Sequence, residues 1–393
     1  MLNGSPKVSP PSLAGIFVRF LRLGLTAFGG PSMVDYIRKM AVKREGWLDE
    51  ATFQDGVALC QTVPGATAMQ TAAYVGFRVR GVPGALAAFT GFGLPAFLLM
   101  MALSAIYMRA RKAPPIVSVL DGLRAIVVAI VANAAFSFGR AALKGWRHIA
   151  IAGVAVLLFG FQISPLLVIA AAGVLGLGFL SASAASSPPR SLGGPGLRDA
   201  APVFYLLGGV AVASFALFLA SPSLFQLAAL MARIDLLAFG GGFASVPLMH
   251  HETVEVRHWL DSQTLLDGIA LGQVTPGPIV ITATFVGYAL RGARGAVVST
   301  IAVFTPSFLL VVGVAPYFDR LRSSPRVARA ISGILCSFVG LLLTVAVRFA
   351  VAVHWNVPQV LLAAAAMALL LLRLDILWVV LGGVAASILL AAR

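Results

Sequence analysis

The sequence predicts an all-α polytopic membrane protein that contains two homologous repeats. Of its 393 residues, 59% are hydrophobic and only 11% are charged, and the mean hydropathy is +0.95. Because roughly a quarter of the residues in a soluble domain are charged, apolar segments this numerous and long indicate membrane helices. The net charge of +15 comes mostly from Arg at the ends of apolar segments, which predicts contact with lipid headgroups. Nucleic acid is not an expected partner.

An internal repeat is the second observation behind this prediction. Residues 47–98 are echoed by residues 259–309, and the second copy drops one residue after its Pro-Gly pair. Each copy places a Pro-Gly break between two apolar arms, so we look for function at the two breaks. The matching positions are Trp47 and Trp259, Asp55-Gly56 and Asp267-Gly268, Gln61 and Gln273, Pro64-Gly65 and Pro276-Gly277, Arg80-Gly81 and Arg291-Gly292, and Pro95 and Pro306.

Composition and the repeat divide the chain into five segments. If each half crosses the membrane an even number of times, one additional helix between the halves, without a counterpart in the first half, would invert the second half relative to the first. We therefore favour two repeats related by an inverted pseudo-two-fold axis. The predicted segments are a disordered tail (1–12), the first repeat (13–181), a flexible linker rich in Ser, Gly and Pro (182–202), an extra transmembrane helix (203–221) and the second repeat (222–393).

Each repeat is expected to contain the same series of helices. An apolar segment that ends in a Gly-rich break comes first, and a short interfacial connector joins it to the paired arms. The predicted ranges are 13–31 and 224–242 for the first segment, 32–46 and 243–258 for the connector, 50–62 and 262–274 for the first arm, 82–108 and 293–318 for a Pro-bearing span, 115–140 and 328–350 for the next span, and 148–161 with 163–181 and 357–372 with 374–391 for two shorter pairs.

The paired arms predict a broken or re-entrant helix pair. Each arm has about 12–15 residues, whereas a span needs about 20, so the pair is tolerated only where protein or a water-filled cavity shields it. A simple Pro-kinked helix is the alternative. Asp is expected to cap each first arm, and Pro is expected to end it and to begin the second arm. The caps are Asp49 and Asp261 for the first arms, and Thr62 or Val63 and Thr275 for the second arms.

The breaks are candidate anion-binding sites. A helix that begins at a break leaves four backbone N–H groups unpaired and points its positive dipole end at the gap, which suits an anion without any charged side chain. Glycine would let the anion approach the backbone closely. The candidate residues are Gln61, Thr62, Pro64, Gly65, Gln273, Thr275, Pro276, Gly277 and Pro278, with Gln70, Thr71, Thr282 and Thr284 as further donors and Gly29, Gly30, Gly240 and Gly241 in the Gly-rich breaks.

Charged residues inside apolar segments are further candidates. Arg22 and Arg233 occupy matching positions, and an Arg inside a span usually faces protein or water; the alternative is an Arg that snorkels to the headgroups. Asp55 and Asp267 could carry a coupling proton, or they are caps or interfacial carboxylates.

Metal and cofactor chemistry are not predicted. His251, Glu255 and His258 would share a helical face, as metal ligands could, but the first repeat has no comparable set and the spacing matches no strong zinc signature. Cys60 and Cys336 lie at unmatched repeat positions, and we interpret them as small core residues.

These motifs resemble the chromate ion transporter (CHR) family in its long, two-domain form. The motifs are FGGP, Trp-Leu-Asp, a Pro-Gly break, G-x4-G-x2-G and a Pro-bearing span, repeated as FGGG and TPGP in the second half. The resemblance covers about 13–181 and 222–391. The chain departs from the family pattern at Ala66, where a second Pro is common, and at Asp35 and Tyr36, where His is common.

The resemblance implies a multi-pass protein of the bacterial inner membrane that exports chromate and confers chromate resistance. Chromate is a tetrahedral dianion close in shape to sulfate, so a transporter of sulfate or another oxyanion is an alternative. An anion channel is a second alternative. A membrane-embedded enzyme would need a catalytic cluster of His, Asp, Glu or Ser, which we do not find in both repeats. A homodimer is the one protein assembly considered.

Overall fold

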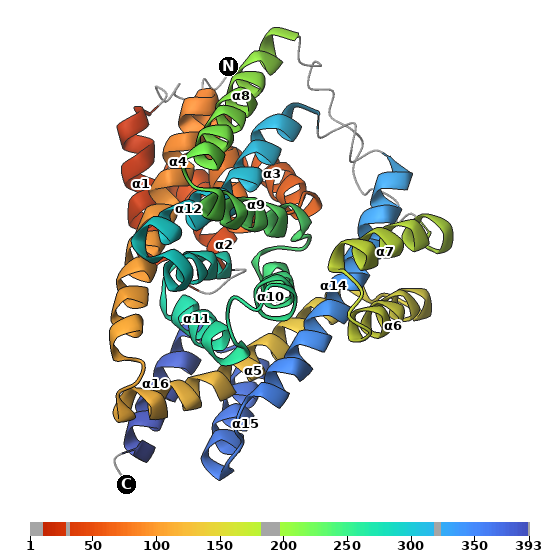
Figure 1. Cartoon of the computed structure of the whole chain (residues 1–393). Coiled ribbons are helices and arrows are strands. Elements are labelled where there is room, and N and C mark those ends of the chain that lie inside the picture. The colour runs from red at the N-terminus through yellow and green to blue at the C-terminus, as the bar shows by residue number, and fades with distance from the viewer. Residues whose placement is uncertain (1–10, 29–31, 182–196, 318–323, 392–393) are drawn as a thin grey trace.

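The computed structural model describes residues 11–28, 32–181, 197–317 and 324–391, and over these residues the chain forms helices and no strand (Figure 1). The predicted tail falls almost wholly, and the linker mostly, outside the described residues. In the first repeat, α1 (Leu13–Thr26) packs against α4 (Thr67–Ala110). In the second repeat, α9 (Pro222–Leu237) packs in the same way against α12 (Thr282–Val314). The first helices of the two repeats, α1 and α9, therefore occupy equivalent positions in the fold.

The paired arms form re-entrant hairpins, hairpin 1 in the first repeat and hairpin 2 in the second. The first arms are α3 (Glu50–Thr62) and α11 (Ser262–Val274). Gly56 lies against the ring of Tyr74, 18 positions later, where a Cβ atom on the glycine would come within 2.2 Å of ring carbons. Gly268 meets Phe285 in the same way at 2.3 Å. Residues this far apart along one helix cannot touch, so the Pro-kinked alternative is excluded.

The caps of the first arms are confirmed, whereas the predicted start of the second arms is wrong. Asp49 and Asp261 each accept a hydrogen bond from the backbone N–H three residues later, at 2.8 and 2.7 Å. The second arm of hairpin 1 begins only at Thr67, and that of hairpin 2 begins at the short η4 (Ile279–Ile281). Proline is not at their first position, because the glycine that follows each Pro has a positive φ that a helix does not allow.

Each second arm turns back sharply into the long span that follows it. Arg80 and Gly81 leave helical geometry inside α4, and Arg291 and Gly292 do so inside α12. At the first turn, Gly76 packs directly on the backbone of Gly84, where an added Cβ would lie 2.2 Å from the carbonyl oxygen. Gly287 packs on the backbone of Gly295 in the same way at the second turn, so both turns depend on glycine, since any side chain would push the two helices apart.

The two repeats exchange their shorter helices. The pair α6 and α7 of the first repeat packs on α14 of the second, while α15 and α16 of the second pack on α5 of the first (Figure 1). Glycine allows close approach in both places: Gly176 meets Gly333, and Gly122 meets Ser387. The repeats are therefore interlocked. The bounds are α5 Pro114–Ala142, α6 Trp146–Gly160, α7 Pro165–Phe179, α14 Pro325–Ala352, α15 Val357–Leu371 and α16 Ile376–Ala391.

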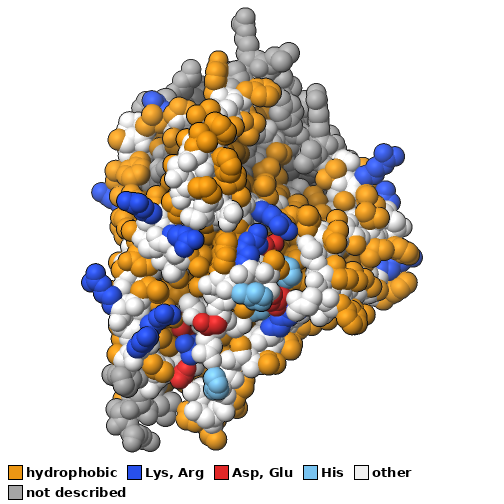
Figure 2. All heavy atoms as spheres, viewed as in Figure 1, with side chains coloured by type: hydrophobic (Ala, Val, Ile, Leu, Met, Phe, Trp, Pro, Cys, Tyr) orange, Lys and Arg blue, Asp and Glu red, His pale blue; other side chains and the backbone are white. Residues whose placement is uncertain are grey.

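The chain is a multi-pass membrane protein. Among the described residues, five helices are long and apolar enough to cross a bilayer. One of them is α8 (Leu197–Ala220), whose stretch Val203–Ala220 is not buried inside the protein. A helix therefore lies where the extra transmembrane helix is predicted between the repeats, and its crossing of the membrane stays a prediction. Hydrophobic side chains cover much of the face seen in Figure 2, as a surface in contact with lipid requires.

The connectors are short helices, as predicted, and the second one is packed inside the protein; an interfacial position stays a prediction for both. Residues 245–253 are all buried, with apolar side chains in the core and charged ones paired inside the protein. The bounds are α2 Ser32–Arg38 and the π-helix η1 Lys39–Arg44 in the first repeat; η2 Gly242–Ala244, α10 Ser245–His250 and the π-helix η3 His251–Val256 in the second; and η5 Ala315–Tyr317 after α12.

Candidate anion site

The tips of the two hairpins are held by reciprocal hydrogen bonds between the repeats. Gly65 donates its N–H to the carbonyl of Ala238 at the end of α9, at 2.9 Å. Gly277 donates its N–H to the carbonyl of Ala27 at the end of α1, at 3.0 Å. Each tip therefore docks on the first helix of the other repeat, which is the pairing expected of a pseudo-two-fold arrangement.

Glycine is required at both tips. Gly65 has a φ of +120° and Gly277 a φ of +109°, a region that other residues rarely adopt. Their N–H groups are not available to a ligand, because they pair with the opposite repeat. The N–H of Ala66 is also engaged and donates to Ser307 Oγ at 3.0 Å. Within the described structure, the unpaired backbone donors at hairpin 1 are thus the N–H groups of the first helical turn after Ala66, which have no partners inside the helix.

A glycine loop after α9 touches both hairpins. Gly240 and Gly241 have positive φ values of +90° and +102°. A Cβ atom on Gly241 would lie 3.2 Å from Thr67 Oγ1 in hairpin 1, and one on Gly242 would lie 3.0 Å from Ile279 in hairpin 2. The loop therefore lies between the N-terminal ends of the two second arms, and its backbone is in contact with both. The predicted Gly29 and Gly30 lie outside the described residues.

One predicted side-chain donor is buried without a partner. The amide nitrogen Nε2 of Gln273 is inaccessible to solvent and makes no hydrogen bond among the described residues, whereas its repeat counterpart Gln61 is exposed. Buried donors are almost always paired, so Gln273 at the end of α11 has the character of a ligand-binding group. The hydroxyls of Thr62, Thr71, Thr275, Thr282 and Thr284 bond other protein oxygens, and Gln70 Nε2 donates to the carbonyl of Pro64.

A buried carboxylate near hairpin 1 was not predicted from the sequence. Asp235 in α9 is fully buried and accepts hydrogen bonds from Ser307 N and Ser307 Oγ, at 2.8 and 3.0 Å. Its repeat counterpart is Gly24, so an argument from matching residues passes over it. An acid in an apolar helix was the signal that could have found it.

The two predicted arginines show no contact with the tips in the described structure. Arg22 is exposed, and Arg233 is 43% exposed and forms an ion pair with Glu252 at 3.2 Å. Neither guanidinium bonds a tip residue among the described parts of the chain.

The second predicted coupling carboxylate is held by an arginine. Asp267 is fully buried, and Arg124 binds both of its oxygens, with Nε–Oδ1 at 2.7 Å and Nη2–Oδ2 at 2.8 Å. Tyr107 donates to the same carboxylate at 2.7 Å. This cluster joins α5 and α4 of the first repeat to α11 of the second. Asp55, its counterpart, is half-buried in α3.

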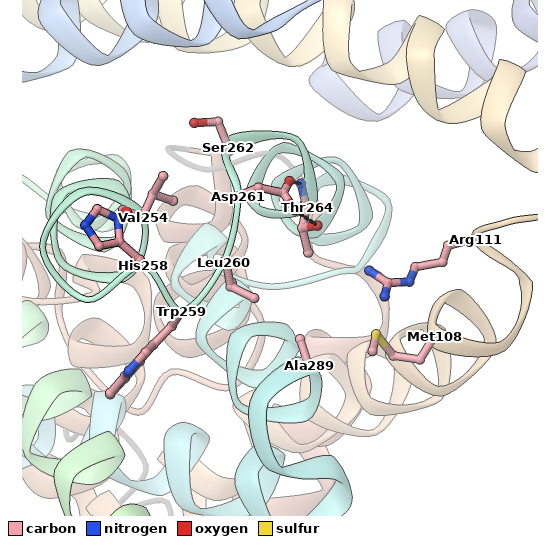
Figure 3. Close-up of a pocket in the computed structure, with 10 residues that line it drawn as sticks. All are labelled: Met108, Arg111, Val254, His258, Trp259, Leu260, Asp261, Ser262, Thr264 and Ala289. Carbon is pink, nitrogen blue, oxygen red and sulfur yellow. Dashed lines mark hydrogen bonds between the residues drawn. The ribbon is translucent and has the colours of Figure 1, made fainter.

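Two adjoining pockets open beside the outer end of hairpin 2. Their volumes are about 600 and 550 Å³, and Arg111, Asp261, Ser262 and Thr264 line both. In Figure 3, Arg111 extends from α4 into the first pocket, across from Thr264 at the start of α11. Lys112 and Arg124 line the second pocket. We call these pockets the basic vestibule, since their cationic side chains favour anions.

The residues considered as metal ligands form an ion-pair cluster instead. His251 and His250 both contact the carboxylate of Glu255, at 2.9 and 3.3 Å, and Arg348 pairs with it too. Burial raises the pKa of Glu255, but the hydrogen bonds from the two histidines and the charge of Arg348 outweigh burial and hold the pKa well below its usual value. The prediction that His258 shares this face is wrong, because η3 ends at Val256 and His258 has a φ of +51°.

Comparison with known proteins agrees with the repeated architecture. The sequence model of the chromate transporter family matches residues 14–177 and again residues 225–388. An uncharacterized transporter of Methanocaldococcus jannaschii is 43% identical over 382 residues, which are 95% of this chain and 94% of the relative.

Two relatives carry the name chromate transport protein. The one from Cupriavidus metallidurans is 31% identical over 94% of this chain and 90% of its own length, and the one from Pseudomonas aeruginosa is 31% identical over 90% and 85%. No solved structure matches the chain. The two matches to one family, in the two interlocked repeats, confirm the resemblance seen in the motifs: this chain belongs to the chromate transporter family.

Proposed function

We propose that the protein exports chromate across the bacterial cytoplasmic membrane and so confers chromate resistance, with the anion bound at the tips of the two hairpins. Membership of the chromate transporter family and the names of two relatives support chromate as the substrate. The multi-pass helical fold and the basic vestibule support an anion as the cargo.

The observation that carries the site is the unpartnered amide of Gln273. A donor buried at a hairpin tip costs free energy unless a ligand or water accepts from it. The N-terminal turn that begins at Thr67 presents further N–H groups and a positive dipole end on the other side of the glycine loop. An oxyanion has acceptors on every face, so it could bond both tips at once.

The basic vestibule would gather the anion before it reaches the tips. Arg111 and Lys112 form no ion pair among the described residues, so their charge acts on solution anions, whereas Arg124 is committed to Asp267. Arg111 and Lys112 outnumber Asp261 among the charged side chains that line the vestibule, and an excess of positive charge raises the local concentration of anions.

Export is the direction that the membrane potential favours. A charge that crosses the membrane gains about 2.3 kcal/mol per 100 mV, so a dianion that leaves a negative interior gains about twice that amount. Import would need coupled cations.

Flux in proteoliposomes tests the function. Purified protein is reconstituted, a potential of either sign is imposed, and labelled chromate movement is followed with sulfate as a competitor. We expect saturable chromate flux that reverses with the sign of the potential. Absence of flux, or unsaturable flux, would refute a chromate carrier, and strong preference for sulfate would make sulfate the substrate.

Glycine variants test the site in the same vesicles. Gly65→Leu and Gly277→Leu place a side chain where the backbone is strained and where Ser307 Oγ or Ala96 Cβ already lies, at 2.0 and 2.8 Å from the added Cβ. Gly153→Leu is the matched control, because nothing lies within 4 Å of its added Cβ. Flux that survives both tip substitutions, in protein that folds like the control, would move the site elsewhere.

A further inference from the structure

The carboxylate of Asp235 is buried, and no cation pairs with it within the described parts of the chain. It lies in the last turn of α9, where the negative end of the helix dipole disfavours an anion. Its hydrogen-bond partners among the described residues are the backbone N–H and hydroxyl of Ser307. Pro306 interrupts the helical ladder just before that serine. Burying a charged carboxylate with no counter-ion is costly, so the group has reason to take up a proton.

Among the described side chains, no charged group faces Asp235 from the helices packed around it. On α9 itself, Arg233 pairs with Glu252. On α12, the charged residues are Arg291 and Arg294 at the hairpin turn, the nearer one 13 residues and about 20 Å along the helix from Ser307. The titratable side chain of α10 is His250, which contacts Glu255, and that of the described part of α8 is the exposed Tyr205. The tip of hairpin 1 contributes none.

A hydrogen-bond chain connects this carboxylate to hairpin 1. The Ala66 N–H donates to Ser307 Oγ at 3.0 Å, and the Ser307 hydroxyl donates to Asp235 Oδ1 at 3.0 Å. While Asp235 is ionised, both bonds are satisfied and the Ala66 N–H is occupied. Once Asp235 is protonated, its own O–H can donate to Ser307 Oγ and compete with Ala66. Protonation thus loosens one backbone donor next to the proposed anion site.

The pair formed by Asp235 and Ser307 occurs in the second repeat and has no counterpart in the first. Gly24 and Ala96 hold the positions that match Asp235 and Ser307. A Cβ on Gly24 would lie 2.4 Å from the carbonyl oxygen of Phe92, so the first repeat closes the space with backbone contact. The chain therefore has one such carboxylate per pair of tips.

We propose that Asp235 binds the proton that accompanies each anion through the protein. The inference rests on the proposed function, because a dianion at the tips disfavours a second negative charge beside them and so promotes protonation of Asp235. The bound ligand is a proton and not a metal cation, since a metal ion needs several oxygen ligands while the groups around this carboxylate are hydrogen-bond donors.

The transport cycle then moves one proton with one dianion. Asp235 takes the proton from water on the side where the anion enters and releases it on the side where the anion leaves. The complex carries one net negative charge through the membrane field. With Asp235→Asn the site stays neutral without a proton, and the anion carries both of its charges across.

Proton uptake on anion binding tests the proposal directly. Purified protein in detergent at pH 8, in weak buffer with an indicator dye, is titrated with chromate. We expect close to one proton taken up per bound anion in the wild type and none in Asp235→Asn. Asp49→Asn is the matched control, since asparagine also caps a helix, and it should take up the proton as the wild type does. Loss of uptake in Asp55→Asn, or uptake that survives in Asp235→Asn, would overturn the assignment.

The charge carried per anion gives a second readout in proteoliposomes. With equal pH on both sides, net flux stops when the chromate concentration ratio across the membrane balances the imposed potential. That ratio is about tenfold per 59 mV when one charge moves with each anion, as expected for the wild type, and about a hundredfold when two charges move, as expected for Asp235→Asn. If Asp235→Asn does not fold, Ser307→Ala replaces it and should reduce proton uptake per anion. Ser104→Ala is the control for this variant, because the Ser104 hydroxyl bonds a carbonyl of its own helix. Wild type without chromate flux would refute the proposed function, whereas flux with identical charge in both proteins would refute this inference alone.

Discussion

Removing Arg124 should destabilise the protein more than removing any exposed arginine. Asp267 is fully buried, and the Arg124 side chain is 14% exposed, so Arg124→Met leaves a buried carboxylate with only Tyr107 to bond it. Breaking a buried pair by removing one partner costs about 3–5 kcal/mol. Because the Tyr107 bond remains, we expect a loss near the lower end, about 3 kcal/mol.

The measurement is the free energy of unfolding in mixed detergent and denaturing micelles. Arg109→Met is the matched control, because Arg109 is an exposed arginine in the last turn of α4, the helix that carries Tyr107. The double variant Arg124→Met with Asp267→Leu should recover most of the lost stability, since an apolar pair avoids the cost of burying a charge. A cost for Arg124→Met no larger than for Arg109→Met would refute the role of this pair as the link between α5 and α11.

Three further predictions follow from the same contacts. Gly76→Ala should abolish folded protein, because its Cβ would meet the Gly84 carbonyl, while Gly153→Ala should be neutral or slightly stabilising, as size-exclusion profiles can show. Since the pKa of Glu255 is held below its usual value, its contribution to stability is complete above about pH 4.3 and declines as the pH falls further; Glu255→Gln should flatten the acid side of the thermal-stability profile. Asp261→Ala should cost about 1 kcal/mol of unfolding free energy and Asp261→Asn much less, and equal costs would contradict its capping role.

Local features of the fold could be predicted from the sequence, and the pairing between repeats could not. Asp49 and the Pro-Gly break act within a few residues of where they stand, so spacing predicts the cap and the break, whereas the start of the second arm at Thr67 depends on the positive φ of Gly65. The packing of α6 and α7 on α14 depends on contacts such as that between Gly176 and Gly333, two residues more than 150 positions apart in the sequence. An inverted relation between the repeats stays a prediction that the reciprocal tip contacts support.

The candidate site shows the same division. Gly65 and Gly277 were expected at the tips, and the structure explains them by their positive φ. Their N–H groups were expected to face the anion but pair with the other repeat, because a tip that is too short to span the membrane must satisfy its backbone against protein. The sequence comparison of the two repeats does not predict Asp235, because it selects residues that occur in both repeats and Gly24 holds the matching position.

The most direct test of the anion site compares the two matching glutamines. Chromate affinity is measured from the concentration dependence of flux in proteoliposomes for the wild type, Gln273→Leu and Gln61→Leu. A hydrogen bond to a charged group contributes about 1.5–3 kcal/mol, so Gln273→Leu should weaken the apparent Kd by about 10- to 150-fold, while Gln61→Leu, at an exposed position, should leave it unchanged. Equal affinity in Gln273→Leu and the wild type would contradict an anion held at the hairpin tips by Gln273, and a larger loss in Gln61→Leu would assign the main side-chain contact to hairpin 1 instead.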